Sequence, residues 1–258
     1  MTDKAPDKFD YAGRDRHYWN TINKIVQDKK IPLENVLRHW SSFIMRRDLP
    51  RFLSHYELFK HVVDLPGCIL EIGVYRGDSL FTWSMLMETF CPFDRSRRVI
   101  GFDSFQGLTQ FTEQDGGSVP SLQGQSGIVW EPDYIANPDD MQQLVDIHNW
   151  DNMMPGTGRL QIKVGNVQDT LPLFLEENPG LKISLLHMDV DLYEPTKYAF
   201  EKLYPLVVQG GVVCFDEYGL VPWQGETRAV DEYFAEHGNP PVIRKFPFAQ
   251  TPHGYFIK

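Results

Sequence analysis

The sequence predicts an α/β fold, namely a doubly wound, mostly parallel sheet of seven strands preceded by an N-terminal helical extension. Three observations indicate it. From about residue 66 onward, short apolar runs alternate with amphipathic stretches, which is typical of successive βα units. A turn with two glycines, Gly73 and Gly77, follows the first apolar run, and several later runs end in acidic residues. We therefore expect a tail and helical extension over residues 1–65 and a core domain over residues 66–258.

The bulk composition fits one large domain with an extension. The chain has 258 residues, of which 42% are hydrophobic, and a formal net charge of −10. This charge disfavours nucleic acid or an anionic membrane as the main partner. The three cysteines do not suggest a disulfide framework, the N-terminus lacks a signal-peptide core, and no apolar run is long enough to span a bilayer. We expect a cytoplasmic protein.

The N-terminal extension is expected to be helical. Apolar residues recur at helical spacing from Tyr18 to Val26, from Val36 to Ile44 and from Leu53 to Val63. Packing explains these side chains better than a cofactor site does. A helical segment before an α/β core often serves as a lid or as an oligomerisation surface, and we expect a homo-oligomer.

The first apolar run and its turn suggest a ligand site. Glu71 lies at the carboxyl end of the first strand, facing the crevice where open α/β sheets bind ligands. The pattern E-x-G-x-x-x-G differs from the G-x-G-x-x-G of dinucleotide sites, and a carboxylate here would repel phosphate. It suits S-adenosylmethionine (SAM), which has an amino group and hydroxyls but no phosphate. An ordinary strand–helix turn is the alternative.

The second strand also ends in an acid. Asp103 closes the apolar run Arg98–Asp103, one βαβ unit after Glu71. A carboxylate at this place can accept hydrogen bonds from both ribose hydroxyls, as an adenosine cofactor requires. A helix-capping or loop carboxylate is the alternative. The irregular stretch over residues 104–155 then starts above the crevice, and we interpret residues 105–130 as part of an active-site cover.

The alternation of strands and helices then resumes. We expect three further strands, Leu160–Val164, Lys182–Met188 and Gly211–Phe215, each followed by a helix, and two closing strands, Val242–Phe246 and Gly254–Ile257.

Four carboxylates follow two of these strands. Asp189 and Asp191 come after the fourth, and Asp216 and Glu217 after the fifth. The carboxyl ends of parallel strands lie on one edge, so these acids should converge and would repel one another unless a cation neutralises them. Oxygen ligands suit Mg²⁺, Mn²⁺ or Ca²⁺. Helix capping and solvation explain one or two such acids but less easily four. His187, within the strand, is interpreted as a core residue.

The two aspartates of the fourth strand should have different roles. A divalent cation lowers the pKa of a hydroxyl that contacts it, and a nearby carboxylate can then accept the proton. Residues two apart on a strand lie about 6.6 Å from each other, so both cannot easily contact one ion. We assign Asp189 to the metal and Asp191 to the proton. Beside SAM, such a site would perform O-methylation.

Several segments together resemble the macrocin O-methyltransferase (TylF/MycF-type) family of SAM- and metal-dependent sugar O-methyltransferases. The likeness covers roughly residues 66–238. Its matching segments are Leu70–Ser79, Phe102–Leu108, Val164–Pro172, Met188–Glu194, Leu203–Pro205 and Gly210–Gly219. The resemblance implies a Rossmann-like SAM-methyltransferase sheet, with SAM and Mg²⁺ (or Mn²⁺) as cofactors.

The resemblance also implies roles for individual residues. SAM would be bound by Glu71, Gly73, Ser79, Asp103, Ser104, Gly165, Asn166 and Asp169. Asp189, Asp216 and Glu217 would ligate the metal, and Asp191 would be the general base. The family usually has Asp-Asp where this chain has Asp216 and Glu217, so Glu217 departs from the pattern.

These features predict an enzyme that transfers a methyl group from SAM to a hydroxyl of a sugar or sugar-containing small molecule, in natural-product or glycan biosynthesis. A catechol acceptor is a second hypothesis. A third is a SAM-fold protein that has lost catalysis and serves as a binding subunit, although the intact set of Asp189, Asp191 and Asp216 argues against it.

Overall fold

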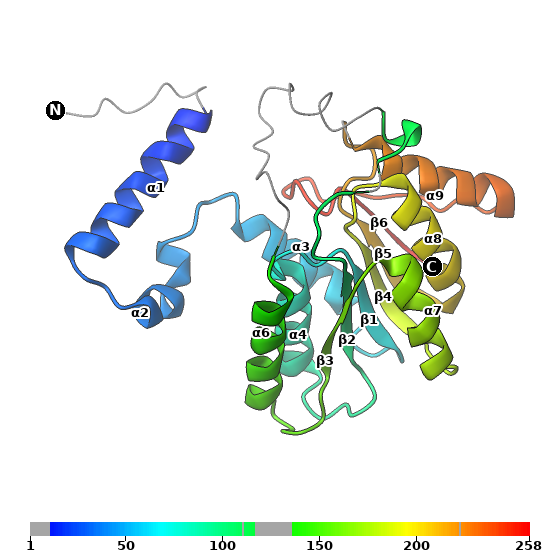
Figure 1. Ribbon diagram of the computed structural model, residues 1–258, viewed down its shortest axis with the longest axis horizontal. Coiled ribbons are helices and arrows are strands. Elements are labelled where there is room, and N and C mark those ends of the chain that lie inside the picture. Colours follow the sequence, from blue (N-terminus) through cyan, green and yellow to red (C-terminus); the bar gives the residue numbers. More distant parts are fainter. Residues whose placement is uncertain (1–10, 110, 117–135, 222) are drawn as a thin grey trace. The chain divides into compact units, whose positions relative to one another are not determined.

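The computed structural model of the chain describes residues 11–109, 111–116, 136–221 and 223–258 (Figure 1). The chain forms two compact units, Met1–Pro50 and Arg51–Lys258. The division falls earlier than the expected boundary at residue 65. The reason is helix α3 (Leu49–Lys60), whose Leu58 and Phe59 are buried in the core of the second unit. No described helix has the length and apolar character needed to cross a membrane.

The N-terminal unit is helical, as predicted. It contains α1 (Tyr11–Asp28), α2 (Leu33–Arg38) and the short 3₁₀ helix η1 (Trp40–Ser42). Tyr18 Oη donates a hydrogen bond of 2.6 Å to the carbonyl of Ile44, and Arg47 forms an ion pair of 2.6 Å with Asp15. These contacts hold the segment after η1 against α1.

The second unit is built on one sheet. Its strands are β1 (Cys68–Ile72), β2 (Val99–Asp103), β3 (Leu160–Val164), β4 (Ile183–Met188), β5 (Val207–Phe215) and β6 (Gly254–Ile257), in the spatial order β3-β2-β1-β4-β5-β6. All neighbouring pairs are parallel except β5 and β6, which are antiparallel. The predicted doubly wound, mostly parallel sheet is confirmed, and the order reverses between β1 and β4, where such sheets bind ligands.

The predicted seventh strand is wrong. The segment Val242–Phe246 makes only one bridge to the sheet among the described residues, between Arg244 and Tyr255. Prolines at 240, 241 and 247 flank it, and proline has no N–H to donate to a ladder. The sheet therefore has six described strands, closed by β6 alone.

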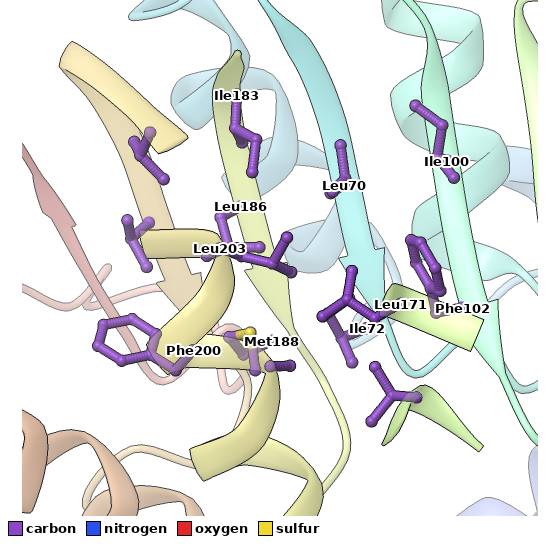
Figure 2. Close-up of a cluster of buried hydrophobic side chains, with 14 of the residues drawn as sticks. Leu70, Ile72, Ile100, Phe102, Leu171, Ile183, Leu186, Met188, Phe200 and Leu203 are labelled. Carbon is purple, nitrogen blue, oxygen red and sulfur yellow. The ribbon is translucent and has the colours of Figure 1, made fainter. Parts of the chain in front are cut away.

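Helices cover both faces of the sheet (Figure 1). One face packs against α3, α4 (Asp78–Phe90) and α6 (Pro138–Asp151), and the other against α7 (Val167–Glu177), α8 (Tyr193–Leu203) and α9 (Gln224–His237). Along β1 the side chains alternate between the two cores, with Ile69 in the first and Leu70 and Ile72 in the second. Figure 2 shows Leu70 and Ile72 in the second core. Burial on both faces explains why the sequences of β1, β2 and β4 are mostly apolar.

The stretch after β2 is only partly described. The predicted cover over residues 105–130 lies largely outside the described residues. Within residues 111–116, the buried carboxylate of Asp115 accepts hydrogen bonds from the backbone N–H and hydroxyl of Thr112, at 2.7 and 2.8 Å, and from the N–H of Tyr193, at 2.7 Å. Asp115 thus fastens the short helix η2 (Glu113–Asp115) to the N-terminus of α8.

Candidate active site

A cavity of about 450 Å³ opens at the carboxyl edge of β1 to β5, within the second unit. It is lined by eleven of the twelve predicted site residues, namely Glu71, Gly73, Ser79, Asp103, Ser104, Gly165, Asn166, Asp189, Asp191, Asp216 and Glu217. The remaining one, Asp169, lies in the first turn of α7 and is not part of the described lining. The cavity is large enough for a nucleoside-type ligand and a small acceptor.

The turn after β1 needs glycine because of its backbone conformation and because neighbouring chain packs against it. Gly73 has φ +92°, and a Cβ there would lie 1.7 Å from the carbonyl oxygen of Asp189. Gly77 has φ +84° and precedes the first turn of α4. The space that a Cβ at Gly73 would need is therefore filled by the loop after β4. This close approach fixes the predicted metal-binding loop beside the predicted cofactor turn.

Asp103 organises the same turn. One of its carboxylate oxygens accepts hydrogen bonds from the backbone N–H groups of Val74 and Tyr75, both at 2.7 Å, and the other accepts one from Phe105 at 2.6 Å. A carboxylate has about four lone-pair sites, so capacity remains for a ligand hydroxyl on the cavity side. The structure thus gives Asp103 an additional role, which is to tie the end of β2 to the turn after β1.

A buried polar chain runs beneath the cavity floor. Glu71 and His187 are register partners on β1 and β4, and His187 Nδ1 lies 3.4 Å from the Glu71 carboxylate. His187 Nε2 lies 2.9 Å from Asp216. Burial opposes charge on the His187 ring, but the charge interaction with Cys214 and the hydrogen bonds to Asp216 and Glu71 outweigh it and raise its pKa. His187 is in the strand core, as interpreted from the sequence, and it also orients Asp216.

The predicted metal ligands Asp189 and Asp216 are brought together by their strand ends. The Asp189 and Asp216 carboxylates and His187 offer ligand atoms that all lie within 4.8 Å of one another. Burial, together with the charge of Asp216, raises the pKa of Asp189 well above its ordinary value. Burial would do the same to Asp216, but the charges of Arg51 and His187 outweigh it and hold its pKa below the usual range. The site is therefore electrostatically asymmetric.

Arg51 is the residue that sequence reasoning missed. From α3 its guanidinium donates to Asp189 at 2.9 Å and to Asp216, so that one cation bridges both carboxylates. It also donates to Ser79 Oγ at 2.7 Å. Its side chain is 23% exposed, and the charges of Asp216 and Asp189 outweigh burial and raise its pKa. Helical spacing was the available signal, since Arg51 lies four and seven residues before His55 and Leu58 on the buried face of α3.

Asp191 differs from Asp189 and Asp216, which both form ion pairs with Arg51. It is half-buried in the loop between β4 and α8, with φ +61°, a left-handed conformation that is rare for residues other than glycine. Burial, together with the charge of Asp216, raises its pKa to about 7. The neighbouring Glu217 carboxyl lowers this pKa in part. Strained backbone and a pKa near neutrality are features of a proton acceptor in an active site.

Glu217 lies behind Asp191. Its backbone N–H donates to the Glu226 carboxylate at 2.9 Å. Both glutamates are buried, and each has one carboxylate oxygen without a hydrogen-bond partner among the described residues. Burial, together with the charge of Asp191, raises the pKa of Glu217 well above its ordinary value. The His187, Asp189 and Asp216 group does not include Glu217, so its ligation of a metal remains a prediction.

The fold and this cavity define a class. A sheet in the order β3-β2-β1-β4-β5-β6, with a glycine turn after its first strand and an acid closing its second, is the fold of SAM-dependent methyltransferases. The chain belongs to the macrocin O-methyltransferase (TylF) family, whose model matches residues 41–245.

Two O-methyltransferases with similar sequences support membership of this family. The chain is 29% identical over 175 residues to the demethyldecarbamoylnovobiocin O-methyltransferase of Streptomyces niveus. It is 27% identical over 178 residues to the 8-demethyl-8-(2,3-dimethoxy-alpha-L-rhamnosyl)-tetracenomycin-C 4'-O-methyltransferase of Streptomyces olivaceus. Each match covers 67% of this chain and 60% of the relative, so the chain spans less than two thirds of the length of these curated relatives.

Solved structures extend the likeness over nearly the whole chain. The calicheamicin methyltransferase CalS11 superimposes with a TM-score of 0.78 at 29% identity, covering 94% of this chain and 92% of that one. The apo structure of CalS11, described as a TDP-rhamnose 3'-O-methyltransferase, gives a TM-score of 0.74 at 28% identity over 94% of both chains. The O-methyltransferase NovP, at 24% identity and a TM-score of 0.60 over 81% of this chain and 79% of that one, shares the fold.

Proposed function

We propose that this chain transfers the methyl group of SAM to a hydroxyl of a sugar or sugar-containing small molecule, with a divalent cation bound at Asp189 and Asp216. The observation that carries the proposal is one cavity that holds the glycine turn, Asp103 and the carboxylates of Asp189, Asp191 and Asp216. The relatives named above support a sugar acceptor, because two of their names specify rhamnose or a rhamnosyl group.

The lining suits SAM along its length. Ser79 and the first turn of α4 offer a hydroxyl and backbone N–H groups to a carboxylate. Asp103 and Ser104 offer oxygens to the ribose hydroxyls, while Gly165 and Asn166 border the place of the base. These assignments follow the family resemblance, and we infer them for this chain together with Glu71, Gly73 and Asp169.

The residues present also fit a divalent cation. Asp189 and Asp216 offer carboxylate oxygens as metal ligands from neighbouring strand ends. Both form ion pairs with Arg51, so a positive charge is accommodated at this place. His187 would hold the Asp216 carboxylate in place, as a second layer of hydrogen bonds does around metal sites. Mg²⁺ or Mn²⁺ is the natural choice for oxygen ligands.

The reaction can be written in terms of this chain's residues. When bound, SAM supplies an electrophilic methyl group on a sulfonium, and the cation lowers the pKa of the acceptor hydroxyl. Asp191 accepts the hydroxyl proton as the oxygen–carbon bond forms and the carbon–sulfur bond breaks. The Gly73 turn and Asp103 hold the cofactor side, and the carboxylates after β4 and β5 hold the acceptor side, so the two reactants meet within one cavity.

The test is label transfer from methyl-labelled SAM. The protein is incubated with deoxysugar nucleotides, glycosylated aglycones and catechols, with Mg²⁺ or with EDTA. We expect transfer to a sugar hydroxyl that stops in EDTA and returns with Mg²⁺ or Mn²⁺. Transfer to a catechol alone would replace the acceptor class. Tight SAM binding without transfer to any acceptor and without a metal response would favour a non-catalytic binding subunit.

The N-terminal unit and the surroundings of the protein belong to the same proposal. We infer that the N-terminal extension, expected over residues 1–65, acts as a lid or an oligomerisation surface through its first 50 residues. We also infer that the protein is a cytoplasmic homo-oligomer, and that its partners are small molecules rather than nucleic acid or membrane. Light scattering of the full chain and of a variant lacking the first 50 residues would measure the oligomeric contribution. An unchanged number of chains per particle would exclude that role for the deleted residues.

A further inference from the structure

Arg51 touches both halves of the candidate site. Its Nη2 lies 2.9 Å from Asp189 and 2.7 Å from Ser79 Oγ, so one nitrogen serves the cation side and the cofactor side together. Its Nη1 donates to Asp216 and to Thr251 Oγ1, and its Nε lies 3.2 Å from Ser79 Oγ. A planar guanidinium with five donors suits such a position, since it can exchange acceptors by small rotations of the side chain.

The guanidinium and a divalent cation compete for the same carboxylates. Of the described residues that line the cavity, seven are acidic and two are basic, Arg51 and Arg76. A positive charge between Asp189 and Asp216 therefore stabilises the site, because a half-buried and a buried carboxylate in proximity are costly when unneutralised. Arg51 supplies that charge in the structure, and its two ion pairs occupy oxygens that a cation would use.

A released guanidinium has an acceptor within reach on the other side. Ser79 lies in the first turn of α4, where backbone N–H groups lack intrahelical acceptors and attract a carboxylate. Arg51 already donates to Ser79 from two of its nitrogens. A carboxylate bound at Ser79 would thus meet a guanidinium directly and gain a charge-assisted hydrogen bond.

We propose that Arg51 couples the cation site to the cofactor site. While the cation is absent, its guanidinium neutralises Asp189 and Asp216; when the cation binds, the guanidinium turns to the cofactor carboxylate at Ser79. This inference rests on the proposed function, because it needs both ligands to bind. Each ligand then raises the affinity of the other by the same factor, since such coupling is reciprocal.

The coupling is measured as binding, without turnover. S-adenosylhomocysteine carries the same α-carboxylate and amino group as SAM. Its dissociation constant is determined by calorimetry in EDTA and at saturating Mg²⁺. We expect the wild-type affinity to rise by roughly five- to a hundredfold with Mg²⁺, the usual range of such coupling. In Arg51→Gln the ratio should fall to about one, and Mn²⁺ without the nucleoside should bind more tightly than to the wild type.

Two further variants separate position from charge and from folding. Arg76→Gln removes the other basic side chain of the lining and should keep the wild-type ratio. Arg51→Lys keeps the charge but loses the planar fork, so it should fold and show a reduced ratio. A ratio of one in the wild type, or a wild-type ratio in Arg51→Gln or Arg51→Lys, would overturn the proposal.

The single-ligand titrations distinguish this failure from failure of the proposed function. If the wild type binds Mn²⁺ and the nucleoside separately but without coupling, only the role of Arg51 is refuted. If it binds no Mn²⁺ with or without the nucleoside, the cation site itself is refuted, and the coupling with it.

Discussion

Replacing Asp103 with asparagine should weaken both the fold of the cofactor turn and the binding of SAM. The wild-type carboxylate accepts three backbone hydrogen bonds, from Val74, Tyr75 and Phe105. An asparagine oxygen can replace one carboxylate oxygen and keep the two bonds to Val74 and Tyr75, but its NH₂ group then faces the N–H of Phe105. One backbone donor is left unpaired, which costs about 1–3 kcal/mol, and the two remaining bonds lose the assistance of the charge.

These terms predict a loss of roughly 2–5 kcal/mol in the free energy of unfolding. SAM affinity should fall by a further ten- to about a hundredfold, because a ribose hydroxyl loses a charged acceptor. Chemical denaturation measures the first effect, and calorimetry with S-adenosylhomocysteine on the still-folded variant measures the second. For the stability effect alone, Ser104→Ala is the matched control, since Ser104 Oγ accepts only an exposed bond from Gln106 among the described contacts. Wild-type affinity in Asp103→Asn would refute the ribose assignment, and wild-type stability would refute the role in the turn.

Three other predictions follow from the same region and its surroundings. Asp191→Asn should keep Mn²⁺ and SAM binding but lower kcat by roughly 10²–10⁴, which is the usual effect of losing a general base. Asp189→Asn should instead weaken Mn²⁺ binding. The opposite pattern in Mn²⁺ titrations of the two variants would reverse the two roles. Gly73→Ala should destabilise the protein by more than about 2 kcal/mol in chemical denaturation, because its Cβ would meet backbone at 1.7 Å, whereas Gly180→Ala, with open space around it, should change little. Burial lowers the pKa of His148, so the unfolded chain binds a proton at this imidazole more tightly than the folded chain does. Stability is therefore lost as the pH falls below about 6.5. His148→Gln should make the decline in unfolding free energy between about pH 7 and pH 5 shallower, and an unchanged decline would contradict this reasoning.

The strands and the carboxylates after them could be predicted from the sequence because their signals are local. The apolar runs that became β1, β2 and β4 are buried along almost their whole length, so most of their residues are apolar. The acids Asp103, Asp189 and Asp216 follow at the carboxyl edge, where a parallel sheet gathers its strand ends.

The misses have a common physical origin in contacts between distant parts of the chain. Arg51 belongs to a helix whose periodicity signals packing, and nothing near it in the sequence indicates that Asp189 and Asp216 will lie beside it. The close approach of Gly73 to the loop after β4 and the hydrogen bonds that Asp103 accepts likewise exist only after the sheet has formed. The segment Val242–Phe246 has strand-like residues, but its pairing depends on whether flanking prolines allow a ladder.

The bridging contacts of Arg51 also have a consequence for how the protein becomes active during folding. These contacts join Arg51 to Asp216, which is 165 residues away in the sequence, and to Thr251, which is 200 residues away. Such distant contacts form late, because a long loop must close before they contribute. We therefore expect the chain to become able to bind its ligands only after β4, β5 and the segment before β6 have packed beside β1. A ligand held at this edge would then stabilise the entire sheet, and partly folded chains would remain unable to bind it.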